Sequence, residues 1–364
     1  MKNVLFLLLT AFSIGAAAQS GERTDVSVRK IANDGTNLWL ATYDGLLKYN
    51  KQTGEQTLYN TDNSGLITNW LNSVACIDGY VWIGTYGSGA AKFNGYMFVP
   101  YDRMGDKESL FYEHQIIIGI AADADGKIWL GGQCGLYRFD GKNWEWNYIP
   151  DSDWRAYVVV SSMAFDKDST LWFGCAGTLL NSLGRITKDG KMEIMQSVGN
   201  ASIYNIAIDK AGNVWFSSID RGIGRFDGTT VERFYSQNSP MPTDLTHGLT
   251  IDEEDNVWFG CGSDLYKYDG ELFTVYELPT EKVVSDVLVD GDVIWVGTYG
   301  GGLFRLANGE ISNIRLIDTP AAIQSVTATA KQATTSTYDL QGRRLTQKPE
   351  KGMYIENGHK RVVK

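Results

Sequence analysis

The stretch IYNIAIDKAGNVWFSSIDRGIGRFDGTTVERFY, residues 203–235, contains the pattern that decides the fold. Its apolar residues come in short runs, as in strands, and none follows the 3.6-residue period of an amphipathic helix. The pair Asp227-Gly228 predicts a two-residue hairpin, in which both residues adopt positive φ. We therefore expect an antiparallel sheet with strands at 203–209, 214–219, 222–227 and 229–235.

Six further stretches repeat this pattern. Each has a tryptophan at the second expected strand, and the seven anchors are Trp39, Trp82, Trp129, Trp172, Trp215, Trp258 and Trp295. Their spacings of 43, 47, 43, 43, 43 and 37 residues fall near the length of propeller blades, roughly 40–50 residues. The sequence therefore predicts an all-β fold, a seven-bladed β-propeller of four-stranded antiparallel blades.

The repeated tryptophan predicts how the blades pack. A blade cannot bury both of its faces alone, so each face packs on a neighbour, and a large ring on the second strand suits the wedge between them. The first copy has its own first strand, at about 25–33, and the last has its own fourth strand, at about 310–316. We therefore expect the ring to close by face packing, without a strand borrowed across the junction.

The N-terminal residues have the features of a secretory signal. Lys2 precedes an apolar run from Val4 to Ile14, and Ala16-Ala17-Ala18 offers a cleavage site of small residues. The run is too short for a transmembrane helix, and no later run reaches the ~18 apolar residues that such a helix needs. We expect a signal peptide at 1–18 and an exported protein, in the periplasm, at the cell surface or outside the cell.

The rest of the chain divides by composition. The repeats predict a propeller over 19–316, residues 317–336 are small and polar like a linker, and 337–364 carry seven Lys or Arg against three Asp or Glu. We expect a small C-terminal β appendage in that basic tail. The whole chain has a formal net charge of −10, which argues against a nucleic-acid partner because such partners need basic grooves.

Two motifs that resemble binding sites fit turns of the repeat better. The glycines of VWIGTYGSG (81–89) precede a strand, whereas a phosphate loop precedes a helix and carries a Lys. Asp123-Ala124-Asp125-Gly126 resembles the start of a calcium loop, but no distal Glu completes it. We expect no cofactor and no metal site.

The four cysteines match no zinc or disulfide framework. Cys175 and Cys261 stand three residues after a tryptophan, where the other copies have Thr, Ser or Gly, so we expect them to be small buried side chains. Cys134, in the third blade, is expected near Cys175 of the next blade, and this leaves a disulfide between them open.

One face of the expected propeller collects the candidate ligand-binding residues. The turns between the second and third strands share this face with the connections between blades, and we call it the loop face. Tyr43, Tyr86 and Tyr299 each stand four residues after a tryptophan in three neighbouring blades, which predicts an aromatic arc able to stack on sugar rings. The alternative, that Tyr is only the favoured turn residue, stays open. The connections add four candidates, which are Trp70, Arg103, Trp154 and Arg155.

His114 and His247 are the candidates for catalysis. Both are expected near the channel mouth, where a pair of histidines can serve as base and acid. The alternative is that each is an ordinary polar residue. No GxSxG or HExxH motif is present.

The repeat unit, as in IWVGTYGGGLFRLANG at 294–309, resembles the two-component regulator propeller repeat over about residues 25–316. That family supplies periplasmic sensor regions of hybrid histidine kinases in gut Bacteroidetes. The resemblance implies a ligand-binding propeller. It does not imply phosphotransfer, because we expect one propeller here and no membrane helix or kinase region. DKAGNVWFSSIDRGIGRFDG at 209–228 is also similar to streptogramin lyase, but the catalytic histidine pattern of that family is not recognisable.

The tail STYDLQGRRLTQKPEKGMYIENGHKRVVK, at 336–364, is similar to the C-terminal sorting domain of type IX secretion in Bacteroidetes. The motifs YDLQGRR and KGMYI and the basic terminus carry the resemblance. It implies attachment at the outer surface through the tail.

Together these patterns favour an exported, non-catalytic propeller that binds a glycan, another extracellular ligand or a protein partner on its loop face. One alternative is a propeller lyase or hydrolase with a site at the channel mouth. The other is a protein–protein scaffold with no small ligand.

Overall fold

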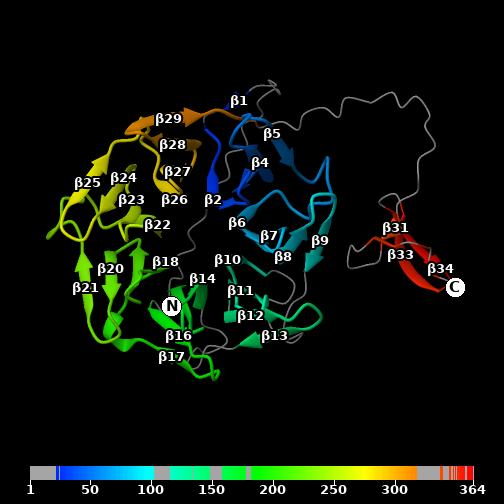
Figure 1. The fold of residues 1–364 in the computed structure, drawn as a ribbon, viewed down its shortest axis with the longest axis horizontal. Coiled ribbons are helices and arrows are strands. Elements are labelled where there is room, and N and C mark those ends of the chain that lie inside the picture. The colour runs from blue at the N-terminus through cyan, green and yellow to red at the C-terminus, as the bar shows by residue number, and fades with distance from the viewer. Residues whose placement is uncertain are drawn as a thin grey trace, which may run out of the picture.

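The computed structural model confirms the all-β fold and the seven blades. It describes residues 22–23, 25–101, 115–133, 135–147, 158–177, 182–317 and, near the C-terminus, 337–338, 344–345, 347, 349, 351–356 and 359–363. Seven sheets, each of four consecutive antiparallel strands, stand around a central axis, with the first strand of each blade innermost and the fourth outermost (Figure 1).

Each blade takes its strands in chain order. Blade 1 consists of β2 (Val28–Asn33), β3 (Asn37–Thr42), β4 (Leu46–Asn50) and β5 (Gln56–Tyr59), and blade 2 of β6 (Leu71–Ile77), β7 (Tyr80–Thr85), β8 (Ala90–Phe93) and β9 (Phe98–Tyr101). Blade 3 consists of β10 (Ile117–Ala122), β11 (Ile128–Gly132), β12 (Gly135–Phe139) and β13 (Trp144–Asn147), and blade 4 of β14 (Val158–Phe165), β15 (Leu171–Gly177), β16 (Leu183–Ile186) and β17 (Met192–Ile194). Blade 5 consists of β18 (Ile203–Ile208), β19 (Val214–Ser218), β20 (Gly222–Phe226) and β21 (Val231–Phe234). Blade 6 consists of β22 (Thr246–Ile251), β23 (Val257–Cys261), β24 (Asp264–Tyr268) and β25 (Phe273–Tyr276). Blade 7 consists of β26 (Val284–Asp290), β27 (Val293–Thr298), β28 (Leu303–Ala307) and β29 (Glu310–Ile314).

The described residues hold two further sheets and one short helical turn. A 3₁₀ turn, η1 (Gln196–Val198), follows β17. Near the C-terminus, β31 (Thr337–Tyr338), β32 (Arg344–Leu345), β33 (Gly352–Glu356) and β34 (His359–Val363) form an antiparallel sheet in the order β32-β31-β33-β34. None of the helices in the described residues is long and apolar enough to cross a membrane. The expected signal peptide, 1–18, and residues 318–336 of the expected linker lie outside the described residues.

The tryptophans fill the wedges between blades, as predicted. All seven are between 2 and 6 % exposed, and each packs into the hydrophobic cluster of the next blade. Trp258 of blade 6, for example, lies with Val284, Val296 and Phe304 of blade 7. In six blades an aspartate at the end of the first strand or just after it accepts a hydrogen bond from the indole Nε1, at 2.7–3.4 Å. A Lys or Arg of the third strand covers each tryptophan ring at 5.4–6.0 Å.

The ring closes between blades 7 and 1 without strand exchange, as expected. Asp286 of β26 is 3 % exposed, accepts a hydrogen bond from the backbone N–H of Ile31 at 2.8 Å and pairs with Lys30 at 2.7 Å. Burial raises the pKa of Asp286, and the Lys30 charge opposes that rise. The closure has a further part that we did not predict. The two-residue strands β1 (Glu22–Arg23) and β30 (Leu316–Ile317) pair with each other, and Gln56 bonds to the backbone at 315 and 317.

Glycine two residues after the tryptophan sets the distance between neighbouring blades. A Cβ placed on Gly84, Gly131, Gly174, Gly260 or Gly297 would come within 2.3–2.8 Å of the first strand of the next blade or its side chains. Ala41 and Ser217 hold the same position in blades 1 and 5. At the five glycine positions the strands therefore approach too closely for a side chain.

We expect Gly260→Ala to lower the free energy of unfolding by about 1–3 kcal/mol, the usual cost of overpacking a core. The new methyl would stand 2.3 Å from Val284 Cγ1. Gly65→Ala is the matched control, because a Cβ there meets no atom within 4 Å. Urea unfolding of both variants measures the difference, and equal stability of the two would contradict this account of the blade spacing.

The turns correct one prediction and support another. Asn308-Gly309 between β28 and β29 is a two-residue hairpin with positive φ at both residues, but the hairpins at Asn94-Gly95, Asp140-Gly141, Asp227-Gly228 and Asp269-Gly270 are longer than two residues. In each of these longer hairpins, only the glycine has positive φ, and the Asx side chain accepts hydrogen bonds from the backbone N–H groups two and three residues on. Asp123 accepts hydrogen bonds from Trp129 and from the backbone of its own turn, which agrees with a turn and not a calcium loop.

The described cysteines Cys76, Cys175 and Cys261 are free thiols, so Cys175 forms no disulfide. Cys134 lies outside the described residues. Cys175 and Cys261 are fully buried, as expected for small core side chains. Burial raises the pKa of Cys76 and Cys175 to about 12 and that of Cys261 to about 11. A thiol that does not ionise near neutral pH is a poor nucleophile.

Candidate functional site

On the loop face, the turn after the second strand of a blade lies beside the segment that leads into the first strand of the same blade or of the next one. The backbone N–H of Tyr86, just after β7, donates to the carbonyl of Trp70, just before β6, at 3.0 Å. Tyr86 also forms an isolated β-bridge to Ile116 of blade 3, and Tyr299 forms one to Ser27 of blade 1. The backbone of both tyrosines is therefore held between two blades.

Trp70 and Tyr86 form an exposed aromatic pair on the loop face. Trp70 is 57 % exposed and Tyr86 is 55 % exposed, and their ring centroids are 6.2 Å apart at an interplanar angle of 60°. Tyr43 of blade 1 is 43 % exposed. Most large apolar side chains of the described residues are buried, so these rings stand out as surface available to a ligand.

Tyr299 belongs to a second group that lies deeper. The guanidinium of Arg29, on β2, lies over the Tyr43 ring at 5.2 Å and over the Tyr299 ring at 4.9 Å. His247, on β22, packs edge-to-face against Tyr299 at 5.7 Å and against Tyr204, on β18, at 5.3 Å. We call Arg29, Tyr43, Tyr204, His247 and Tyr299 the inner cluster. It joins blades 1, 5, 6 and 7 across the centre of the ring.

The inner cluster depends on an irregularity in the innermost strands. The ladder between the first and second strands shifts register early in the first strand of every blade. In blades 1 to 5 and 7 the residue that the shift leaves out of the ladder is Arg29, Asn72, Ile118, Ser161, Tyr204 or Ser285. In blade 6 His247 still pairs with Gly260, and the shift follows it. Such bulges re-aim a side chain. Two of these positions supply Arg29 and Tyr204, and His247 is the last paired residue before the shift in blade 6.

Arg29 and Tyr204 were not predicted as site residues from the sequence. A signal was present, because Arg29, Asn72, Ser161, Tyr204 and His247 are separated by multiples of 43 or nearly so and hold one position of the repeat. A single Arg or Tyr at the start of a strand does not by itself indicate a binding site.

The expected arc of three tyrosines divides into two groups. Tyr43 and Tyr299 meet through Arg29, whereas Tyr86 contacts Trp70. Four other candidates, Arg103, His114, Trp154 and Arg155, lie outside the described residues.

The inner cluster is a low-dielectric environment. Burial, with a smaller effect of the Arg29 charge, lowers the pKa of His247 to about 4, so the ring is neutral at pH 7. Burial also raises the pKa of Tyr204 and Tyr299, which keeps both phenols protonated. Among the described residues, no group of three or more His, Cys, Asp or Glu side chains could hold a metal ion.

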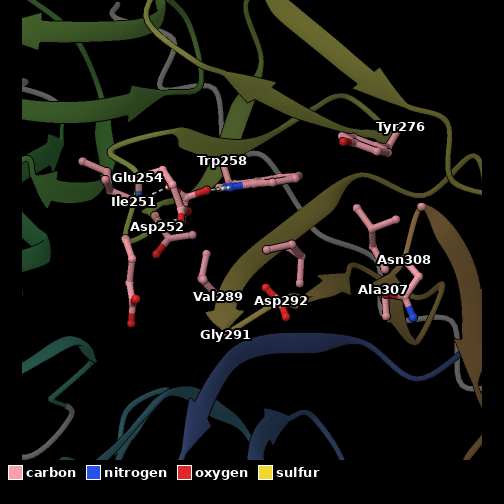
Figure 2. A pocket seen from close by; sticks show the side chains of 15 residues that line it. Ile251, Asp252, Glu254, Trp258, Tyr276, Val289, Gly291, Asp292, Ala307 and Asn308 are labelled. Carbon is pink, nitrogen blue, oxygen red and sulfur yellow. Dashed lines mark hydrogen bonds between the residues drawn. The ribbon is translucent and has the colours of Figure 1, made fainter.

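The cavity of about 680 Å³ between blades 6 and 7 lies at the opposite ends of the strands (Figure 2). Trp258 forms one wall and donates to Asp252, while Tyr276 and Asp292 lie on other sides. A cavity of about 610 Å³ recurs between blades 1 and 2, beside Trp39 and Asp34. The space is therefore a crevice made by the repeat, not a site particular to one blade.

The fold is shared with solved propellers. The extracellular domain of a putative hybrid two-component system from B. thetaiotaomicron is 19 % identical, with a TM-score of 0.64 over 79 % of this chain and 39 % of that one. Virginiamycin B lyase from Staphylococcus aureus, solved as a catalytically inactive variant with quinupristin, is 17 % identical, with a TM-score of 0.65 over 79 % of this chain and 97 % of that one. PorZ, a surface component of the type IX secretion system of Porphyromonas gingivalis, is 16 % identical, with a TM-score of 0.56 over 77 % and 46 %.

No protein-family model and no curated protein matches the chain. At identities below 20 %, the likeness to these structures concerns the fold alone. The neighbours include an extracellular domain of a putative two-component system and a lyase, so the propeller by itself does not choose between binding and catalysis.

Proposed function

We propose that this protein is an exported, non-catalytic propeller that binds a glycan on its loop face. The observation that supports this most is the exposed pair of Trp70 and Tyr86, with Tyr43 exposed on the neighbouring blade. Exposed aromatic faces stack on the flat apolar faces of sugar rings, and loops on a rigid scaffold are where binding residues gather. A protein partner would use the same face.

The proposed location follows from both ends of the chain. Residues 1–18 resemble a secretory signal and 337–364 resemble a type IX sorting tail. Two neighbours of similar fold are an extracellular domain and a surface component of that secretion system. We propose that the tail carries the propeller to the outer surface of the cell.

We expect Trp70→Ala and Tyr86→Ala each to weaken glycan binding about 10-fold or more, the effect of losing ~1–3 kcal/mol of ring stacking. Their unfolding transitions should remain close to that of the wild type, because both rings are more than half exposed. A glycan array with the full-length protein finds the ligand, and calorimetry then measures the affinity of each variant.

Tyr96→Ala is the matched control for this experiment. Tyr96 is 87 % exposed and lies in the turn between β8 and β9, at the other end of the strands. Unchanged binding in the Trp70 and Tyr86 variants, or an equal loss in Tyr96→Ala, would count against the loop face. Tyr299→Ala is a poorer probe, because its packing on Arg29 and His247 also contributes to stability.

A lyase or hydrolase is the second candidate, and His247 is the observation that favours it. Its ring lies between two phenols and is neutral at pH 7, although a pKa of about 4 makes it a weak base. Product analysis of every glycan that binds tests this candidate. Turnover by the wild type that persists in His247→Ala would remove His247 from any catalytic role.

A further inference from the structure

We propose that the inner cluster binds the anionic group of an acidic saccharide, a carboxylate or a sulfate, with the Arg29 guanidinium as its main contact. This inference rests on the proposed glycan-binding function and adds the class of glycan. It starts from a cation that has ring contacts on two sides and, among the described residues, no anion.

Arg29 has no ionic partner among the residues that the structure describes. Its contacts are the rings of Tyr43 and Tyr299, and its Nε is buried without a hydrogen-bond acceptor. Arg29 is half-buried, so its guanidinium is partly desolvated, and a partly desolvated charge without a partner lowers stability. An anion supplied by a ligand would remove that cost.

Nearby carboxylates are already engaged. Asp286 pairs with Lys30 and accepts the N–H of Ile31. Asp220, whose charge acts on Tyr204, accepts hydrogen bonds from Ser218 Oγ at 2.5 Å and from the N–H of Ser202 at 3.2 Å. Neither is an ion-pair partner of Arg29.

The groups around Arg29 suit an oxyanion. A guanidinium offers a planar set of N–H donors that match two oxygens of a carboxylate or sulfate, and flanking rings hold such a plane in place. The hydroxyls of Tyr204 and Tyr299 make no hydrogen bond with the described residues and remain protonated donors. Neutral His247 carries one ring N–H. The cluster therefore offers donors from three blades around one cation.

The position of Tyr43 links this site to the loop face. Its ring contacts Arg29 and is also 43 % exposed, so one residue borders both the half-buried cation and the surface. A saccharide that stacks on the exposed rings can place an acidic substituent on Arg29. Neutral sugars would leave the guanidinium unpaired.

The test is a glycan array of neutral, carboxylated and sulfated oligosaccharides, probed in parallel with full-length wild type, Arg29→Met and Arg225→Met. Calorimetry then measures affinities for the strongest hit of each class. Arg225 is the matched control, because it also covers a ring, Trp215 at 5.9 Å, and has a buried Nε without an acceptor, but it lies on β20, away from the first strands. Carboxylated and sulfated arms show which oxyanion is preferred.

We expect acidic hits to dominate, Arg29→Met to weaken them about 10- to 100-fold, as for a lost charged hydrogen bond, and Arg225→Met to leave them unchanged. Wild-type affinity for the acidic hit should also fall as NaCl rises, a measurement that needs no variant. Neutral hits of equal strength, a salt-independent affinity or acidic binding retained by Arg29→Met would overturn the inference while leaving the proposed function. If no glycan of any class binds, the proposed function falls, and the inference falls with it.

Discussion

Trp258→Ala is expected to lower the free energy of unfolding by about 3–5 kcal/mol, the cost of removing a buried tryptophan. The ring is 6 % exposed, lies among the core residues of blade 7 and stacks on Tyr276 at 5.5 Å. Its loss opens a cavity between two blades and leaves Asp252 without its 2.7 Å indole donor. Denaturant unfolding at pH 7 measures the change.

Two variants make this result specific. Trp258→Phe keeps most of the packing and removes the indole N–H, so we expect a loss of only about 1–2 kcal/mol. Trp70→Ala removes the same side chain from an exposed position and should cost less than about 0.5 kcal/mol. A similar loss in Trp70→Ala and Trp258→Ala would show that the wedge between blades does not stabilise the ring.

Acidification from pH 6.5 to pH 4 is expected to destabilise the propeller through His247. The native ring has a pKa of about 4, against an ordinary value of 6.5. Below pH 6.5 the unfolded chain takes up a proton at this residue and the native protein does not, so stability falls with pH. The loss reaches about 3 kcal/mol near pH 4, where the native ring also becomes protonated.

His247→Gln isolates this contribution, because glutamine does not titrate. The other two histidines and all carboxylates remain, so the difference between the two stability curves belongs to His247. As the pH falls from 7 to 4, we expect the free energy of unfolding of the wild type to fall by about 3 kcal/mol more than that of His247→Gln. Parallel curves over that range would show that the ring is not held neutral in the native protein.

The repeat allowed the fold to be predicted from sequence. Seven tryptophans at nearly equal spacing predicted the blades, and the burial of Trp82 and its six equivalents confirms the wedge. The first and last copies, such as the strand that starts near Val28, predicted closure without strand exchange. Hairpin detail was less predictable. An Asx-Gly pair such as Asp227-Gly228 fits several turn types, and here the side chain caps a longer turn.

The candidate site was predictable only in part. Tyr43 and Tyr86 are exposed on the loop face as expected, but Tyr299 packs against Arg29 and His247. The register shift at Arg29 and Tyr204, and just after His247, leaves no signal in the composition, because a bulge is a property of strand pairing. These residues recur at the period of the repeat, but only the arrangement of the blades around the propeller shows that blades 1, 5, 6 and 7 meet at the inner cluster.

The pairing of β1 with β30 has a mechanical consequence. Leu316 and Ile317 follow β29 directly and are held by Glu22, Arg23 and Gln56. Tension applied to the chain beyond Ile317 therefore acts first on this clamp, and only afterwards on the outer strand of blade 7. In a propeller tethered by its C-terminal end, the β1–β30 pair would therefore open before any strand of a blade is pulled away, at the junction where the ring closes.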